Sequence, residues 1–194
     1  MVSFSNFHRL DPAARDVAIE LLANAQGQPP SFMAFMYRWM AFNGWMSAVT
    51  LKDTDREMID AFVAAPRLID AFDQLMAGDP DFRQMVTEFT ALWPLLNVRS
   101  VRAKLGYDAF RQHDRAALLA LCAAENVKQQ PAGWVAGGQP SWEQLLRTIY
   151  QVRCNLFHGE KSPQSFRDRD LVFASDRILA RFIAATGCFD WYDL

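Results

Sequence analysis

Apolar residues recur along most of this chain at the three- and four-residue spacing of amphipathic helices. Turn and capping residues separate these segments. The pattern predicts helices at about 12–25, 32–46, 54–63, 68–76, 82–93, 108–124, 141–158 and 167–187, while residues 94–106 are not assigned and residues 129–140 read as a loop. No segment of four or more residues alternates cleanly between apolar and polar positions. The sequence therefore predicts an all-α fold, a helical bundle.

Local signals mark the ends of several of these helices. Pro12 stands at the first position of the first helix, and Ser31 is placed to cap the second. Ser141 followed by Gln144 has the spacing of a capping box. Gly159 has the place of the residue that ends the helix 141–158.

The second helix carries aromatic or methionine residues around most of its circumference, which predicts a place in the middle of the domain. Arg38 and Asn43 are exceptions within that apolar stretch. A buried arginine needs a partner. Arg38 is therefore expected either in an internal salt bridge or facing the same cleft as His158.

Composition limits the possible classes of protein. A chain of 194 residues fits one domain, here taken as 1–194, or one domain with a small appendage. Its formal net charge of -2 argues against a nucleic-acid binder that uses its whole surface. The three cysteines form no CxxC pair, so neither a disulfide framework nor a zinc site is expected, and no metal or cofactor. With neither a signal-peptide core nor a membrane span in view, we expect a cytoplasmic protein.

The most informative stretch is 153–161, in which four residues separate Arg153 from His158 near the predicted end of a helix. Arginine grips phosphate with two parallel hydrogen bonds, and histidine transfers protons near neutral pH. On an ideal helix the two side chains would point about 140° apart, but a last turn that tightens or unwinds could relax this. Near a helix C-terminus the dipole would favour the imidazolium form of His158 and so a general acid.

The surroundings of this stretch are locally basic. Between positions 144 and 169 the sequence has five cationic residues and only two acidic ones, Glu160 and Asp168. The five are Arg147, Arg153, Lys161, Arg167 and Arg169. A polyanion site requires such an excess. Arg99, Arg102 and Lys104 either extend that surface or form a solvated helix face.

Residues 149–163, followed by Arg167, Asp168 and the helix from Leu171, resemble the C-terminal part of a HEPN (higher eukaryote and prokaryote nucleotide-binding) domain. The hallmark of that superfamily is an arginine and, after a short spacer, a histidine at the junction of two bundle helices. The match covers about 35 of the 194 residues. One departure is Cys154, because ribonuclease members usually carry a polar residue directly after the arginine, whereas here the polar residue is Asn155.

The resemblance implies an up-and-down four-helix core with additional helices, a homodimer and metal-independent RNA cleavage through the 2′-hydroxyl. Catalysis would then fall to Arg153, His158 and Asn155, with Arg153 stabilising the charge on phosphorus. We expect substrate contacts from Lys161, Arg147 and Arg38. Because one imidazole cannot act as base and acid on opposite sides of phosphorus, two motifs in a dimer cleft would supply both.

Several functional hypotheses follow. The first is a ribonuclease, which could be the effector of a toxin–antitoxin or phage-defence system with a cognate antitoxin protein. The second is a non-catalytic HEPN-like module that binds nucleotide, RNA or a protein partner. The third is an unrelated interaction protein whose aromatic second helix forms a partner groove. Arg153 could equally be a structural ion-pair residue, and His158 a histidine that caps the helix.

Overall fold

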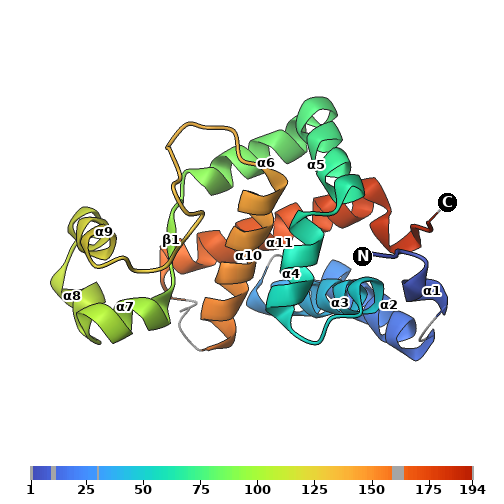
Figure 1. Cartoon of the computed structure of the whole chain (residues 1–194), viewed down its shortest axis with the longest axis horizontal. Coiled ribbons are helices and arrows are strands. Elements are labelled where there is room, and N and C mark those ends of the chain that lie inside the picture. Colours follow the sequence, from blue (N-terminus) through green and yellow to red (C-terminus); the bar gives the residue numbers. More distant parts are fainter. Residues whose placement is uncertain (1, 10–11, 30, 159–163, 194) are drawn as a thin grey trace.

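The computed structural model describes residues 2–9, 12–29, 31–158 and 164–193, and it confirms the all-α helical bundle (Figure 1). In chain order the elements are α1 (Asn6–Arg9), α2 (Pro12–Gln26), α3 (Phe32–Thr50), α4 (Asp55–Val63), α5 (Pro66–Gly78), α6 (Pro80–Thr90), β1 (Leu95–Leu96), α7 (Val98–Leu105), α8 (Ala109–Gln112), α9 (Arg115–Ala124), β2 (Gln129–Gln130), α10 (Trp142–Phe157), α11 (Phe166–Thr186) and the 3-10 helix η1 (Cys188–Asp190).

The capping residues act as the sequence predicts. The side chain of Ser31 accepts a hydrogen bond from the N–H of Ala34 and starts α3. At the start of α10, Ser141 accepts from the N–H of Gln144, and the Gln144 side chain accepts from the N–H of Ser141, which completes the capping box. The position of Gly159 lies outside the described residues.

Helix α3 packs against α2, α4 and α11 and runs along the lower side of the bundle in Figure 1. Its apolar circumference predicts a place in the middle of the domain, but Met33 and Met40 are 47% and 45% exposed, so only one side of the helix is enclosed. Trp39, Phe42 and Trp45 on α3 are completely or almost completely buried. The Trp45 ring contacts the Phe62 ring of α4 edge-on, with 5.0 Å between centroids. The aromatic side of α3 is therefore core, which argues against its use as a partner groove.

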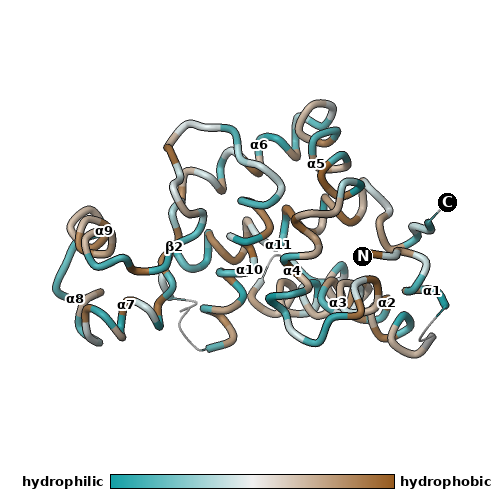
Figure 2. The backbone as a smooth tube through the Cα atoms, in the orientation of Figure 1, coloured by the Kyte–Doolittle hydropathy of each residue, from teal (hydrophilic) through white to brown (hydrophobic). Residues whose placement is uncertain are grey.

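Two separate hydrophobic cores divide the molecule. The larger one joins the helices of the bundle, α2 to α6, α10 and α11. The smaller one holds together what we call the α7–α9 lobe, residues 96–127, and consists of six buried residues: Leu96, Val101, Ala109, Leu118, Cys122 and Val127. The lobe projects to one side of the bundle (Figure 1). Figure 2 shows hydrophobic and hydrophilic residues interleaved along α7, as expected of a helix with one buried face.

The lobe is also where the predicted elements were incomplete. Residues 108–124 form two helices instead of one, because Asp114 caps a new helix by accepting from the N–H of Ala117. The unassigned segment 94–106 contains β1 and α7. Strand β1 pairs antiparallel with β2, with Leu95 opposite Gln130, and this short ladder connects the lobe to the loop before α10.

The C-terminal residues fold back on the N-terminal ones. The Asp193 carboxylate accepts hydrogen bonds from Ser3 Oγ at 2.6 Å and from the N–H groups of Phe4 and Ser5. The Phe189 ring stacks on Trp45, with 5.2 Å between centroids. Both ends of the described chain are thereby tied to the bundle.

Candidate functional site

Arg153 lies on the side of α10 that faces α4. Its Nη1 lies 2.9 Å from Oδ2 of Asp55, the first residue of α4, and its guanidinium stacks over the Phe157 ring at 4.6 Å. The side chain is only 21% exposed, and its buried Nε has no hydrogen-bond partner among the described residues. Arg153 therefore makes a structural ion pair in this chain, which is one of the two roles that the sequence allowed.

Asn155 is buried on another face of α10, with 3% of its surface exposed. Its Nδ2 donates to the carbonyl of Leu96 at 3.0 Å, and its Oδ1 accepts from Nε2 of Gln151 at 2.8 Å. Asn97 Nδ2 in turn donates to Gln151 Oε1. This polar network fastens the base of the lobe to α10, so Asn155 has a clear structural role, in addition to any contact it makes with a ligand in the adjoining cavity.

His158 is exposed at the C-cap of α10, as predicted, and contacts α7. Arg99 Nη2 lies 2.9 Å from His158 Nδ1. A guanidinium can only donate, so Nδ1 is the acceptor in this contact, and the neutral ring carries its proton on Nε2. In this contact Nε2–H is the group of His158 that can donate to a ligand.

Arg153 and His158 are not brought together within one chain. Helix α10 stays regular to Phe157, and the His158 N–H still bonds to the carbonyl of Cys154, so the last turn does not swing the two side chains toward each other. The partner of Arg153 is on α4 and the partner of His158 is on α7, and these helices flank α10 on opposite sides (Figure 1). The guanidinium beside the imidazole is that of Arg99.

The predicted substrate-binding residues have other partners. Arg38 is corrected to a structural residue, because it is buried in the bundle with its Nε 2.7 Å from Oδ1 of Asp176. Arg147 bonds to Asp60 and Glu143, both at 2.8 Å, so two carboxylates already balance its charge. Lys161 lies outside the described residues.

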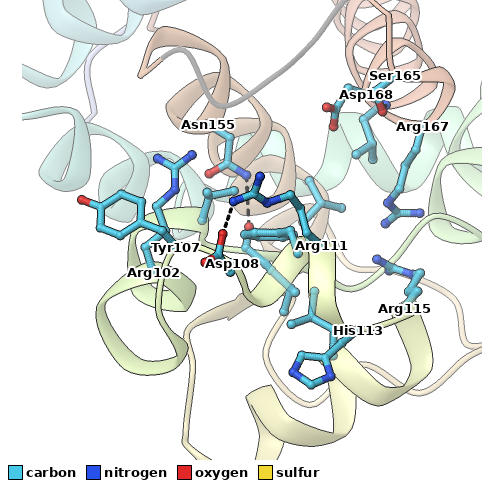
Figure 3. A pocket seen from close by; sticks show the side chains of 16 residues that line it. Arg102, Tyr107, Asp108, Arg111, His113, Arg115, Asn155, Ser165, Arg167 and Asp168 are labelled. Atoms are coloured by element: carbon cyan, nitrogen blue, oxygen red, sulfur yellow. Dashed lines mark hydrogen bonds and ion pairs between the residues drawn. The ribbon is translucent and has the colours of Figure 1, made fainter.

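A cavity of about 670 Å³ opens between the α7–α9 lobe and the bundle (Figure 3). Polar, aromatic and cationic side chains line it; those labelled in Figure 3 are Arg102, Tyr107, Asp108, Arg111, His113, Arg115, Asn155, Ser165, Arg167 and Asp168. The lobe supplies one wall, and α10 and the start of α11 supply the other. Sequence reasoning missed this cavity, because its walls come from segments far apart in the chain, residues 95–118, Asn155 and residues 165–171.

Arg115 and Arg167 meet at this cavity. Both donate from Nη2 to the carbonyl of Leu92, and Arg115 also donates to that of Pro94 at 2.9 Å. Burial first, and then repulsion from Arg115, lowers the pKa of Arg167 to about 10. Burial also lowers the pKa of Arg115.

No three His, Cys, Asp or Glu side chains among residues 2–9, 12–29, 31–158 and 164–193 are grouped so as to hold a metal ion. In the same part of the chain, none of the helices has the length and apolar character that a membrane crossing needs.

Comparison with known proteins returned no relative. No family model, no curated protein and no solved structure matches the chain.

Proposed function

We propose that this chain binds single-stranded RNA at the His158 end of α10, as a module resembling HEPN domains. The observation that carries the proposal is the exposed contact of Arg99 Nη2 with His158 Nδ1, at 2.9 Å. This contact leaves the Nε2–H of His158 and the remaining N–H groups of Arg99 available as donors to phosphate oxygens. The resemblance of residues 149–163 to HEPN domains favours RNA as the polyanion.

The neighbouring charge on α7 supports the same ligand. Arg99 has no carboxylate partner among the described residues, and Lys104 Nζ donates to the carbonyl of Asn126 at 2.8 Å instead of to an acid. The chain as a whole carries a formal charge of -2, so this local excess is not a general property of its surface. Binding to phosphates would release counterions and would weaken as salt increases.

Fluorescence anisotropy with a labelled single-stranded RNA tests the proposal. Arg99→Gln is expected to weaken binding and to reduce the slope of log K against log salt by about one, as for the loss of one phosphate contact. The control is Arg56→Gln, which removes a charge from an arginine that is 88% exposed on α4. If Arg99→Gln and Arg56→Gln bind RNA alike, or the wild type does not bind, the proposal is wrong.

Metal-independent RNA cleavage is a second candidate function, and the accessible Nε2–H of His158 is the observation that favours it. Attack of the 2′-hydroxyl on phosphorus would break the bond to the 5′-oxygen and leave a 2′,3′-cyclic phosphate and a 5′-hydroxyl. The leaving oxygen would take the Nε2 proton of the imidazolium form of His158, whose Nδ1 is then protonated and no longer accepts from Arg99, and the ring is left neutral; the 2′-hydroxyl proton passes to the opposing base. Because one imidazole cannot act as acid and base on opposite sides of phosphorus, the opposing base would come from a second copy in a homodimer.

Cleavage and binding are distinguished by incubating the RNA with the protein in EDTA. If the second candidate function is right, the wild type yields cyclic-phosphate products and His158→Ala yields none while keeping its helical circular dichroism. Binding without products leaves the first proposal standing and removes the second. Products that require magnesium contradict the second as well.

A further inference from the structure

The cavity beside the α7–α9 lobe is more basic than the protein as a whole. Its lining includes four arginines, namely Arg102, Arg111, Arg115 and Arg167, against two carboxylates, Asp108 and Asp168. One of the arginines is neutralised directly, because Arg111 is paired with Asp108. The positive charge is concentrated at the opposite end, where Arg115 and Arg167 extend toward each other from α9 and α11 (Figure 3).

These two guanidiniums are held close together by a shared acceptor. Arg115 Nη2 and Arg167 Nη2 both donate to the carbonyl oxygen of Leu92, so they lie within two hydrogen-bond lengths of each other. Like charges at that separation repel. Burial first, and then this repulsion, lowers the pKa of Arg167, while the charges of Asp168 and Asp170 act in the opposite direction. An anion bound between the two guanidiniums would relieve their repulsion.

The pair differs from four other arginines of the described chain, although Arg67 and Arg83 also donate to backbone carbonyls. Arg38, Arg147, Arg153 and Arg181 each lie within 2.9 Å of a carboxylate oxygen. Within the described residues, Arg115 and Arg167 have neutral carbonyls as their hydrogen-bond acceptors and no carboxylate at ion-pair distance. An arginine has five N–H donors in a planar fork, so each retains donors for an additional acceptor.

We propose that Arg115 and Arg167 bind the phosphate group of a small phosphomonoester, such as a nucleoside monophosphate. Two guanidinium forks can surround a phosphate with parallel charge-assisted hydrogen bonds. The cavity volume of about 670 Å³ is in the range of small-ligand sites. Tyr107 and Phe110, which are 80% and 42% exposed, provide aromatic surface in the same cavity for the organic part of the ligand.

This site is distinct from the proposed RNA site. Neither Arg99 nor His158 is among the residues that line the cavity. The two proposals therefore succeed or fail separately.

Isothermal titration calorimetry with adenosine 5′-monophosphate, inorganic phosphate and adenosine tests the inference on the whole chain. The monophosphate is expected to bind, phosphate to compete with it, and adenosine to bind at least about tenfold more weakly, because it lacks the charge-assisted hydrogen bonds. If adenosine binds as tightly as the monophosphate, the aromatic wall and not the arginine pair holds the ligand, and the proposal is wrong. Absence of binding by both the monophosphate and phosphate also overturns it.

Variants assign the site to the arginine pair. Arg115→Gln, at an exposed residue, and Arg167→Lys, which keeps the charge and a donor for Leu92, are each expected to weaken binding of the monophosphate by about tenfold or more. Arg177→Gln is the matched control, because Arg177 is an exposed arginine on the same helix as Arg167 and does not line the cavity. Equal affinity of Arg115→Gln and Arg177→Gln contradicts the proposal, even if Arg167→Lys fails to fold. RNA binding is expected to persist in Arg115→Gln.

Discussion

Arg153 and Asp55 join α10 to α4 through an ion pair with 2.9 Å between Nη1 and Oδ2, in which the side chains are 21% and 25% exposed. The arginine of the HEPN-like motif is thus engaged inside the chain, on the side of α10 away from the contact of His158 with Arg99. A substitution of Arg153 is therefore expected to affect stability first.

Replacing Arg153 by Gln is expected to lower the free energy of unfolding by about 1–2 kcal/mol, because a partly buried Asp55 loses its partner. Urea unfolding measures the change. Asp55→Asn is expected to cost a similar amount, and the double variant less than the sum of the two. If Arg153→Gln abolished RNA binding or cleavage at unchanged stability, the arginine would have a direct role at the site, and our structural assignment would be wrong.

The ion pair between Arg38 and Asp176 is much more deeply buried, with side chains 7% and 4% exposed. Arg38→Met alone is expected to destabilise the protein by about 3–5 kcal/mol, because it strands a buried carboxylate. The double variant Arg38→Met, Asp176→Leu is expected to recover most of that loss, since no unpaired charge remains. Thermal and urea unfolding check both. A double variant as unstable as the single one would show that packing, and not charge, sets the cost.

Asn155→Ala tests whether the buried amide is a structural residue. The change leaves the carbonyl of Leu96 and the Gln151 amide without their partner, and we expect a loss of about 1–3 kcal/mol in the free energy of unfolding. The control is Asn24→Ala, which removes an exposed amide that bonds to the carbonyl of Glu20, and should change stability by less than about 0.5 kcal/mol. Unchanged stability in Asn155→Ala would contradict the assignment.

Asp193 makes stability depend on pH. The hydrogen bond from Ser3, followed by those from Ser5 and Phe4, lowers the pKa of this carboxyl below the ordinary value of an aspartate. The unfolded chain therefore takes up the proton first, so this contribution is complete above about pH 4 and is lost as pH falls through the lower folded-state pKa. In urea unfolding, the stability difference between wild type and Asp193→Asn is expected to shrink as pH falls from 5 toward 3. A stability difference that stays constant over that range would contradict this role of Asp193.

Local signals allowed much of the fold to be predicted from sequence. Ser31 and the pair Ser141 and Gln144 cap their helices within three residues, and such short-range contacts can be read directly. The single helix predicted over 108–124 was wrong because the capping role of Asp114 outweighed the apolar pattern on both sides of it.

The candidate site could be predicted only in part. The exposed His158 at the end of α10 follows from the motif, but its contact with Arg99 joins residues 59 positions apart. Arg115 and Arg167 meet because the lobe packs beside α11, and no periodicity in either segment encodes that meeting. The partner of Arg153 on α4 could not be predicted from the sequence either, since several acidic residues were possible partners.

The separate core of the α7–α9 lobe has a kinetic consequence. Six buried side chains hold the lobe, whereas the bundle shares a far larger cluster, so the lobe should open by a sub-global event of lower free energy than complete unfolding. Native-state amide exchange would then be faster for Leu118 in α9 than for Trp45 in α3. The wall of the cavity that carries Arg115 would thus open transiently by itself. A solute could then enter and leave the cavity while the bundle stays folded.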